Sequence, residues 1–204
     1  MCCRYWFEES PELMPFVEEM NRSPLLDGFV RTGAVIASGE VRPTNVAPVI
    51  ASNRRGRRAV FPMKWGFGGR TLLINARTET AATKPTFSQS WRSRRCIVPA
   101  SGYIEWEHLT GENGRKKTGA RYLIRSRDSN LVFMCGLYRI EDGLPAFVIL
   151  TREPGEDTRF IHDRMPLMLP EERVGAWIDP GAKPEELLTD AVTAMRCLRG
   201  VETT

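Results

Sequence analysis

Three β-rich segments that follow one another with only short turns between them constrain the fold most strongly. They span residues 121–127, 131–140 and 145–151. The residues between them, Asp128-Ser129-Asn130 and Glu141-Asp142-Gly143, are typical turn formers. Strands joined by such short connections must run antiparallel, because a parallel crossover needs about a dozen residues or more. The sequence therefore predicts an antiparallel meander in the second half of the chain.

Shorter segments on both sides of the meander add further strands and helices. Strands are expected at 45–52, 58–67, 72–74, 96–100 and 103–107, and helices at 10–22, 86–95, 170–178 and 184–198. The length of 204 residues suits one domain with a sizeable core, and no repeat or low-complexity linker divides the chain. We expect a single α+β domain over residues 1–204, with a mostly antiparallel sheet flanked by short helices.

Composition argues against several classes of protein. No apolar run approaches the roughly 18 residues of a membrane span, and the N-terminus lacks the basic-then-apolar pattern of a signal peptide. The cysteines are odd in number and form no CxxC pair, which favours a reducing compartment and argues against a zinc site. We expect a cytoplasmic monomer, nucleoid-associated if the source is bacterial, with no membrane contact, metal or cofactor.

The net charge of +4 hides a strong segregation along the chain. Residues 1–50 carry 4 basic and 7 acidic side chains, residues 51–125 carry 16 and 4, and residues 126–204 carry 9 and 14. The middle segment, with its net charge of +12, is the candidate surface for a polyanion such as nucleic acid. It can equally be a solvated basic face without a partner.

Cys2 could take part in a reaction that is closed to any internal cysteine. It follows the initiator Met, and cysteine is small enough for that Met to be removed. Removal leaves an α-amine, with a pKa of about 7.7–8.0, on the same residue as a thiol. Such a 1,2-aminothiol reacts with an aldehyde first as a Schiff base and then as a five-membered thiazolidine ring. The simpler interpretation is that Cys2 is merely the second residue.

Glu105 lies on a predicted strand with two different faces. Alternation places Tyr103, Glu105 and Glu107 on one face. Ile104 and Trp106, on the other face, are expected in the core. Glu105 then faces either a cleft, where it could act as a proton acceptor, or plain solvent.

His162 and Asn75 are further candidates for a site. His162 is one of two histidines, and its side chain can move protons near neutral pH, although a lone histidine is usually structural. The other, His108, borders a polar loop and is expected to be exposed. Asn75 and Arg77 alternate where a strand runs into a helix, so both can point into one cleft, and Arg77 suits a phosphate. Asn75 can also be a simple turn or cap residue.

Six ordered motifs together resemble the SOS response-associated peptidase (SRAP) family from residue 1 to about 178. The motifs are MCCRY, RPTNVAPV, MKWGF, INARTETA, CIVPASGYIEW and IHDRMPLML. The resemblance implies a single domain around a mostly antiparallel, barrel-like sheet. It also implies removal of Met1 by the protein itself, and a thiazolidine crosslink between Cys2 and abasic sites in single-stranded DNA.

The resemblance also assigns roles to individual residues. The implied active-site residues are Cys2, Asn75, Glu105 and His162. The implied DNA-contacting residues are Arg4, Arg77 and Arg164 for the backbone and Asn45 in a motif that lines the cleft. Beside these, Trp65 or Phe67 could stack on a base. The sequence departs from the family at Cys3, where glycine is usual, and in the short segment 66–70, which lacks the aromatic residues of some bacterial members.

The predicted function is therefore the sensing and covalent capture of abasic sites in single-stranded DNA, as part of the response to DNA damage. This activity is lyase-like, with a hydrolytic, protease-like step that removes Met1. The alternative is a cysteine peptidase that acts on other proteins, which needs Cys–His activation and a peptide groove. A non-covalent nucleic-acid module would carry the basic residues but would not need the placement of Cys2.

Overall fold

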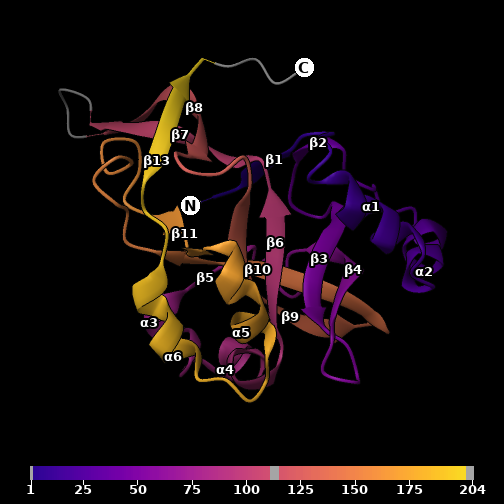
Figure 1. The fold of residues 1–204 in the computed structure, drawn as a ribbon. Coiled ribbons are helices and arrows are strands. Elements are labelled where there is room, and N and C mark those ends of the chain that lie inside the picture. Colours follow the sequence, from indigo (N-terminus) through magenta and orange to yellow (C-terminus); the bar gives the residue numbers. More distant parts are fainter. Residues whose placement is uncertain (1, 111–114, 201–204) are drawn as a thin grey trace.

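A five-stranded barrel forms the centre of the molecule (Figure 1). The computed structural model describes residues 2–110 and 115–200. The barrel strands are β3 (Val46–Ser52), β4 (Arg58–Trp65), β6 (Arg95–Ala100), β9 (Val132–Glu141) and β10 (Leu144–Arg152). The order β4–β3–β6–β9–β10 is antiparallel throughout, and a parallel pairing of β10 with β4 closes the ring.

Tight turns join the barrel strands that are neighbours in sequence. At the tip between β3 and β4, the Asn53 side-chain oxygen accepts hydrogen bonds from the backbone N–H groups of Arg55 and Arg57. Between β9 and β10, Asp142 and Gly143 both have positive φ angles, 50° and 82°. Two consecutive residues of this kind are typical of the turns whose twist matches a β-hairpin. The β9–β10 hairpin confirms this part of the predicted meander. The first predicted strand of the meander does not belong to it, because β8 (Lys116–Ser126) pairs with strands of a second sheet and not with β9.

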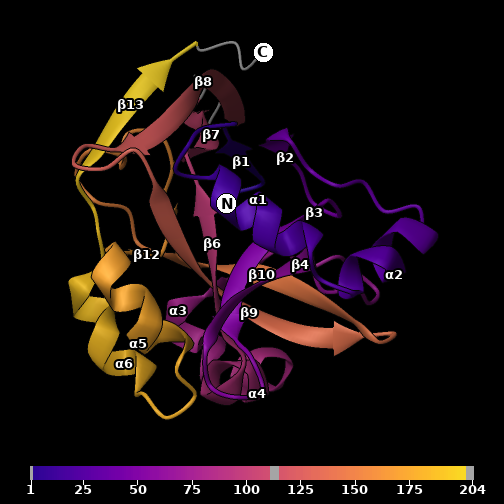
Figure 2. The ribbon, with the colours of Figure 1, turned by 45° about the vertical axis from the view of Figure 1, so that its right-hand side comes forward.

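A second antiparallel sheet lies across one end of the barrel (Figure 2). Its order is β13 (Met195–Arg199), β8 (Lys116–Ser126), β7 (Gly102–Thr110), β1 (Arg4–Phe7) and β2 (Gly39–Val41). Ser101 alone separates β6 from β7, so the chain passes directly from the barrel into this sheet. Short strands β5 (Asn75–Arg77) and β11 (Met165–Pro166) pair with β10, and β12 (Met168–Leu169) pairs with β9.

Two large apolar clusters are built from alternate residues of the same strands. On β3, Val49 and Ala51 belong to the first cluster, together with Cys2, while Ile50 between them belongs to the second. The first cluster fills the space between the barrel and the second sheet. The second is covered by helices: α3 (Thr78–Ala81), α4 (Pro85–Ser93), α5 (Val174–Ile178) and α6 (Pro184–Leu187), with 3-10 turns η1 (Glu171–Arg173) and η2 (Leu188–Asp190).

Two further helices pack on the barrel: α1 (Met14–Asn21) lies beside β3 and β4, and α2 (Leu25–Arg31) lies beside β4 and β10 (Figure 2). The structure confirms an α+β domain with a mostly antiparallel, barrel-like sheet and short helices. Within the described residues, no helix is both long and apolar enough to span a bilayer.

The C-terminal helix expected over 184–198 is wrong in its second half. α6 ends at Leu187, η2 follows, and Met195–Arg199 is a strand paired with β8. The pairing supplies the backbone hydrogen bonds and buries Met195, and these tertiary contacts override the local helical pattern. The short strand expected at 72–74 is also displaced: Leu73 forms only an isolated bridge to Phe67, and β5 begins at Asn75.

The polar loop expected after Glu107 is shorter than the sequence indicates, because β7 continues to Thr110 and β8 begins at Lys116. Residues 111–114 of that loop lie outside the described residues.

Arg95 is a buried arginine that connects α4 and α5 to the barrel. Its side chain is 2% exposed and stacks over Trp177. The guanidinium donates hydrogen bonds to five backbone carbonyl groups, those of Trp91, Arg92, Trp177, Asp179 and Ala182. A buried carbonyl group without a hydrogen-bond donor lowers the free energy of unfolding, so these contacts hold α4, α5 and the chain after α5 against the barrel.

We expect Arg95→Met to destabilise the protein by about 3 kcal/mol or more, because it leaves several buried carbonyl groups without donors. Denaturant unfolding measures this change. Arg92→Met, at an exposed position on the neighbouring helix, is the control and should change stability by less than about 0.5 kcal/mol. Equal stabilities of the two variants would contradict the role given to Arg95.

Candidate functional site

Cys2 lies inside the molecule and not on a loose terminus. It precedes β1, which is inserted between β7 and β2 in the second sheet. Its side chain is 1% exposed and belongs to the first apolar cluster. The thiol donates a hydrogen bond to the carbonyl oxygen of Arg4 at 3.3 Å. The pairing of β1 therefore fixes Cys2 at the boundary between barrel and sheet.

Asn75 contacts Cys2 directly. It is the first residue of β5, and its Nδ2 donates a hydrogen bond to the carbonyl oxygen of Cys2 at 2.8 Å. β5 pairs in parallel with β10, with Asn75 opposite Ile149. The Oδ1 atom of Asn75 is buried and has no hydrogen-bond partner among the described residues. It therefore offers a buried acceptor beside Cys2.

Glu105 is the buried carboxyl group of the site. Its side chain is 3% exposed, and burial raises its pKa above the ordinary value. Burial also raises the pKa of the Cys2 thiol, and the charge of Glu105 adds to that rise. Both shifts favour the neutral forms, so at neutral pH Cys2 carries a thiol and not a thiolate. Nucleophilic attack by a thiolate is thereby disfavoured in this form of the site.

The alternation predicted for β7 is confirmed for its central residues. Tyr103 and Glu105 face the space occupied by Cys2, and both are buried. Ile104 faces the opposite way into a small third cluster with Trp6 and Leu123, against which the half-buried Trp106 packs. Both faces of β7 are thus covered, so Glu105 is buried and not solvated.

His162 lies on the segment that leads into β11, and it is 6% exposed. The N–H of His108 on β7 donates to the carbonyl oxygen of Ile161, and the rings of His108 and His162 are 4.0 Å apart between centroids. Burial is the main cause of the raised pKa of Glu105, and the negative charge of Asp163 adds a smaller rise. Asp163, the residue after His162, therefore lies near Glu105. The structure thus brings the His162 segment to the strand that carries Glu105.

Tyr5 is a residue of this site that sequence reasoning missed. It lies on β1, it is fully buried, and its hydroxyl has no hydrogen-bond partner within the described part of the chain. Burial raises its pKa, and the neighbouring Cys2 adds to this. Its ring packs against Trp65 at 5.2 Å. The only signal in the sequence was its position three residues after Cys2.

Arg77, Arg4 and Asn45 differ in how accessible their side chains are to a phosphate. Arg77 is exposed at the end of β5, two residues from Asn75, and no ion pair with a described residue occupies it. The side chain of Arg4 is 29% exposed and pairs with Glu40 at 3.1 Å. Asn45 is half-buried, and its Oδ1 accepts a hydrogen bond from the backbone of Arg42, so it stabilises the turn before β3.

Two of the expected DNA contacts require correction. Trp65 is 0% exposed, its indole N–H donates to the carbonyl of Ile74, and its ring stacks against Phe147 inside the first cluster. It has no free face for a base. Arg164 is 8% exposed and donates to both carboxylate oxygens of Glu79, at 2.7 and 2.9 Å. In this arrangement it anchors the His162 segment to α3 and is not available to a phosphate.

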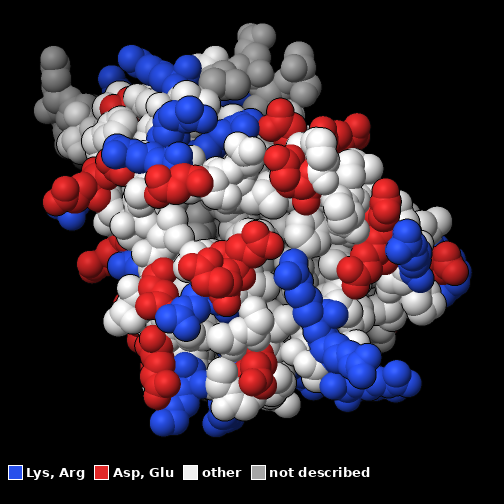
Figure 3. All heavy atoms as spheres, viewed as in Figure 1, with Lys and Arg blue, Asp and Glu red and all other residues white. Residues whose placement is uncertain are grey.

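The basic side chains are divided into separate groups on the face shown in Figure 3. They gather over β8 and β13 and, separately, over the β3–β4 hairpin, with acidic side chains between them. Arg95 from the same segment is buried, and Arg121 and Arg125 pair with Glu40 and Glu8. The sequence count of charge therefore overstates the surface that one polyanion could contact.

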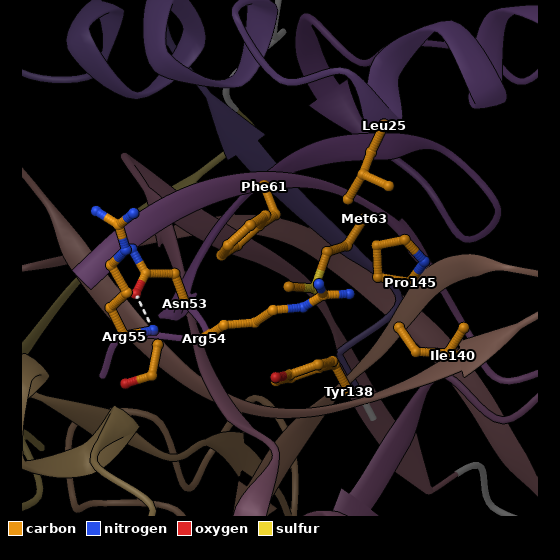
Figure 4. A pocket seen from close by; sticks show the side chains of 10 residues that line it. Leu25, Asn53, Arg54, Arg55, Phe61, Met63, Tyr138, Ile140 and Pro145 are labelled. Carbon is orange, nitrogen blue, oxygen red and sulfur yellow. Dashed lines mark hydrogen bonds between the residues drawn. The ribbon is translucent and has the colours of Figure 1, made fainter. Parts of the chain in front are cut away.

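A separate apolar cavity of about 540 Å³ lies beside the β3–β4 hairpin (Figure 4). Phe61, Met63 and Tyr138 point into it, and Arg54 extends across it. None of the four expected active-site residues lines it. It lacks the thiol, carboxyl and amide groups that lie together at Cys2, so the residues around Cys2 are the candidate site.

Comparisons with solved structures show the same fold. A crystal structure of a protein from Bacteroides thetaiotaomicron matches with a TM-score of 0.71 and 22% identity, and the match covers 97% of this chain and 91% of that one. A phage-related protein from Bordetella bronchiseptica matches with a TM-score of 0.71 and 23% identity, and 98% and 95% of the two chains are covered.

Sequence comparisons extend the likeness. The abasic site processing protein YoqW of Bacillus subtilis is 32% identical, over 88% of this chain and 81% of that protein. The abasic site processing protein YedK of Escherichia coli is 32% identical over 66% and 63% of the two chains. The family described as SOS response associated peptidase (SRAP) matches residues 1–200. The chain therefore belongs to the SRAP family.

Proposed function

We propose that this protein captures abasic sites in single-stranded DNA by bonding Cys2 to the aldehyde of the exposed sugar. The observation that carries the proposal is the enclosure of Cys2 by Asn75 and Glu105. Membership of the SRAP family and the names of the curated relatives, abasic site processing proteins, support the same substrate class. If the source is bacterial, such a substrate would place the protein with the nucleoid.

The first step in the proposal is hydrolysis of the bond between Met1 and Cys2, which releases the α-amine of Cys2. The amine then adds to C1′ of the ring-opened sugar, and loss of one water gives an imine. The Cys2 sulfur adds to the imine carbon while its proton passes to the nitrogen, which closes the thiazolidine. The raised pKa of the thiol suits this order, because the amine and not the sulfur attacks first.

Asn75 and Glu105 have proposed roles that match their positions beside Cys2, and His162 has one that matches its chemistry. Glu105 accepts the proton that the amine must lose before it attacks, and its raised pKa brings it nearer to the operating pH of a general base. Asn75 orients Cys2 through its carbonyl group, and its open Oδ1 can accept a hydrogen bond from the amine or the sugar. His162 protonates the sugar ring oxygen as the ring opens.

The proposed DNA path passes Arg77, which is exposed two residues after Asn75 on β5. A guanidinium can form two parallel hydrogen bonds to a phosphate. The alternative, a peptidase acting on other proteins, is less well supported. Such an enzyme needs an activated thiolate and an accessible groove, whereas the Cys2 thiol is buried and neutral. The same burial is compatible with a single self-cleavage at the adjacent Met1.

We expect Cys2→Ala to abolish covalent capture of single-stranded DNA that contains an abasic site, since it removes the thiol that closes the ring. Non-covalent binding should be largely retained, because phosphate contacts supply most of that affinity. Denaturing gels and intact-mass spectrometry of the complex measure both species. Cys3→Ser is the matched control and should still crosslink. Crosslinking by Cys2→Ala, or Met1 retained in crosslinked wild-type protein, would contradict the mechanism.

Glu105→Gln should slow crosslinking by about 100-fold or more, because it removes the general base. The same change should raise the melting temperature at pH 7. The pKa of Glu105 is higher in the folded protein than in the unfolded chain, where it is about 4.3. The neutral carboxyl group therefore leaves the free energy of unfolding at its full value below about pH 4.3. That free energy falls as pH rises through the folded pKa and the buried group becomes charged.

The stability difference between Glu105→Gln and wild type should therefore disappear near pH 4. Thermal unfolding across this pH range tests the sign. Glu107→Gln, two residues along the same strand, is the control for both measurements and should resemble wild type. A lower melting temperature of Glu105→Gln at pH 7 would mean that burial does not dominate at this carboxyl group.

Arg77→Ala should weaken non-covalent binding and reduce the slope of log affinity against log salt by about one. Fluorescence anisotropy with abasic single-stranded DNA at several salt concentrations measures this slope. Arg92→Ala removes an equal charge from an exposed position on α4, outside the proposed site, and should leave the slope unchanged. An unchanged slope for Arg77→Ala would remove Arg77 from the DNA path.

A further inference from the structure

The two histidines of the chain meet in the structure although they are far apart in sequence. Their ring centroids are 4.0 Å apart. Nδ1 of His162 also lies 2.8 Å from Oδ1 of Asp163. His108, His162 and Asp163 each offer one potential metal-ligand atom, and these three atoms all lie within 4.8 Å of one another. We name these three residues the His–His–Asp cluster.

The fold builds this cluster from two elements. A register shift in the pairing of β7 with β8 falls between Trp106 and His108. Such irregularities redirect the side chains that follow them. The N–H of His108 then donates to the carbonyl oxygen of Ile161 at 2.8 Å, which fixes the segment of His162 against β7. The cluster is therefore held by backbone hydrogen bonding and is not a chance meeting of two surface side chains.

We propose that the His–His–Asp cluster binds a divalent transition-metal ion, with Zn²⁺ as the best fit. Two imidazole nitrogens and one carboxylate oxygen are a donor set that zinc accepts in tetrahedral sites. Ligands of one zinc ion lie about 3.4 Å apart, given bonds of roughly 2.1 Å. His108 is exposed and Asp163 has 74% of its side chain exposed, so both can make the small movement that closes the site.

Two neighbours contact the same ring nitrogen of His162. Its Nδ1 lies 3.0 Å from the backbone N–H of Arg164, which requires an unprotonated nitrogen, and 2.8 Å from the Asp163 carboxylate, which requires a protonated one. A metal ion can be bound through Nε2 of His162, which leaves the Arg164 contact in place, or through Nδ1 in exchange for that contact.

The surroundings leave room for the ion and for a fourth ligand. A cavity of about 500 Å³ opens at the cluster, and all three residues line it. Glu153 lines the same cavity and can supply the fourth oxygen, as can water. Arg159 also lines it and is the one arginine among the lining residues, beside two carboxylates, Glu153 and Asp163. The site is therefore reachable from solvent.

Metal binding would have a consequence for the activity, and this step rests on the proposed function. A coordinated imidazole cannot take up and release a proton as the free ring does, because its lone pair is used by the metal. Zinc at the His–His–Asp cluster would thus prevent His162 from protonating the sugar oxygen. The site then acts as a metal-dependent brake on crosslinking, while the arginine contacts to DNA are left in place.

The binding test uses the full chain after treatment with a chelator, titrated with Zn²⁺ in competition with a chromogenic zinc indicator. We expect one zinc ion per wild-type chain, and an affinity about tenfold or more lower in His108→Gln and in Asp163→Asn. Circular dichroism verifies that both variants are folded. Zinc affinity in His108→Gln equal to that of wild type would overturn the proposal.

Co²⁺ as a spectroscopic probe separates this site from the thiols of Cys2 and Cys3, which also attract zinc. Binding at the His–His–Asp cluster gives a visible spectrum without a thiolate-to-cobalt charge-transfer band. Such a band in the first equivalent of Co²⁺, lost in Cys3→Ser, would assign the metal to the cysteines and overturn the proposal.

The activity test compares crosslinking rates with chelator and with zinc. Wild type should slow severalfold or more in zinc, whereas His108→Gln should crosslink at the same rate in both conditions. Zinc that slows His108→Gln as strongly as wild type would contradict the brake. Zinc binding at the cluster in a protein that never crosslinks would support the metal site and contradict the proposed function.

Discussion

The insertion of β1 between β2 and β7 is the interaction on which the candidate site depends. Strand pairing fixes the backbone from Arg4 onward, so Cys2 is held in the apolar cluster between barrel and sheet. Asn75 adds a hydrogen bond from a strand of the barrel side. A terminal residue is normally among the most mobile in a protein, and here it is positioned by two elements distant in sequence.

The site places ionisable groups where burial disfavours their charge. The pKa of Glu105 and that of the Cys2 thiol are both raised, with burial as the first cause. Such an arrangement opposes stability and is typical of functional sites, where groups are shifted toward the pH at which they work. Around it, rigid contacts compensate: Arg164 binds Glu79, and Arg95 binds five carbonyl groups below the barrel.

The structure also separates charge that the sequence places together. Of the arginines between residues 51 and 125, some form the hairpin tip, one is buried, and others pair with Glu40 or Glu8. The proposed DNA contact therefore rests on the exposed Arg77 beside the site and not on the total of +12. The His–His–Asp cluster is the opposite case, because the fold brings together residues that the sequence separates. His108 follows the irregularity in β7, and His162 follows the barrel strand β10.

The sequence by itself determined the fold class, most strand positions, the chemical option of Cys2 and the family, because these follow from local periodicity, turn residues and ordered motifs. It also placed Tyr103 and Glu105 on one face of β7. Only the tertiary structure decided that Trp65 is core, that Arg164 is paired, that Met195–Arg199 is a strand and that His108 meets His162. Each of these depends on a partner distant in the chain, and burial and pairing with such a partner are properties that local sequence does not encode.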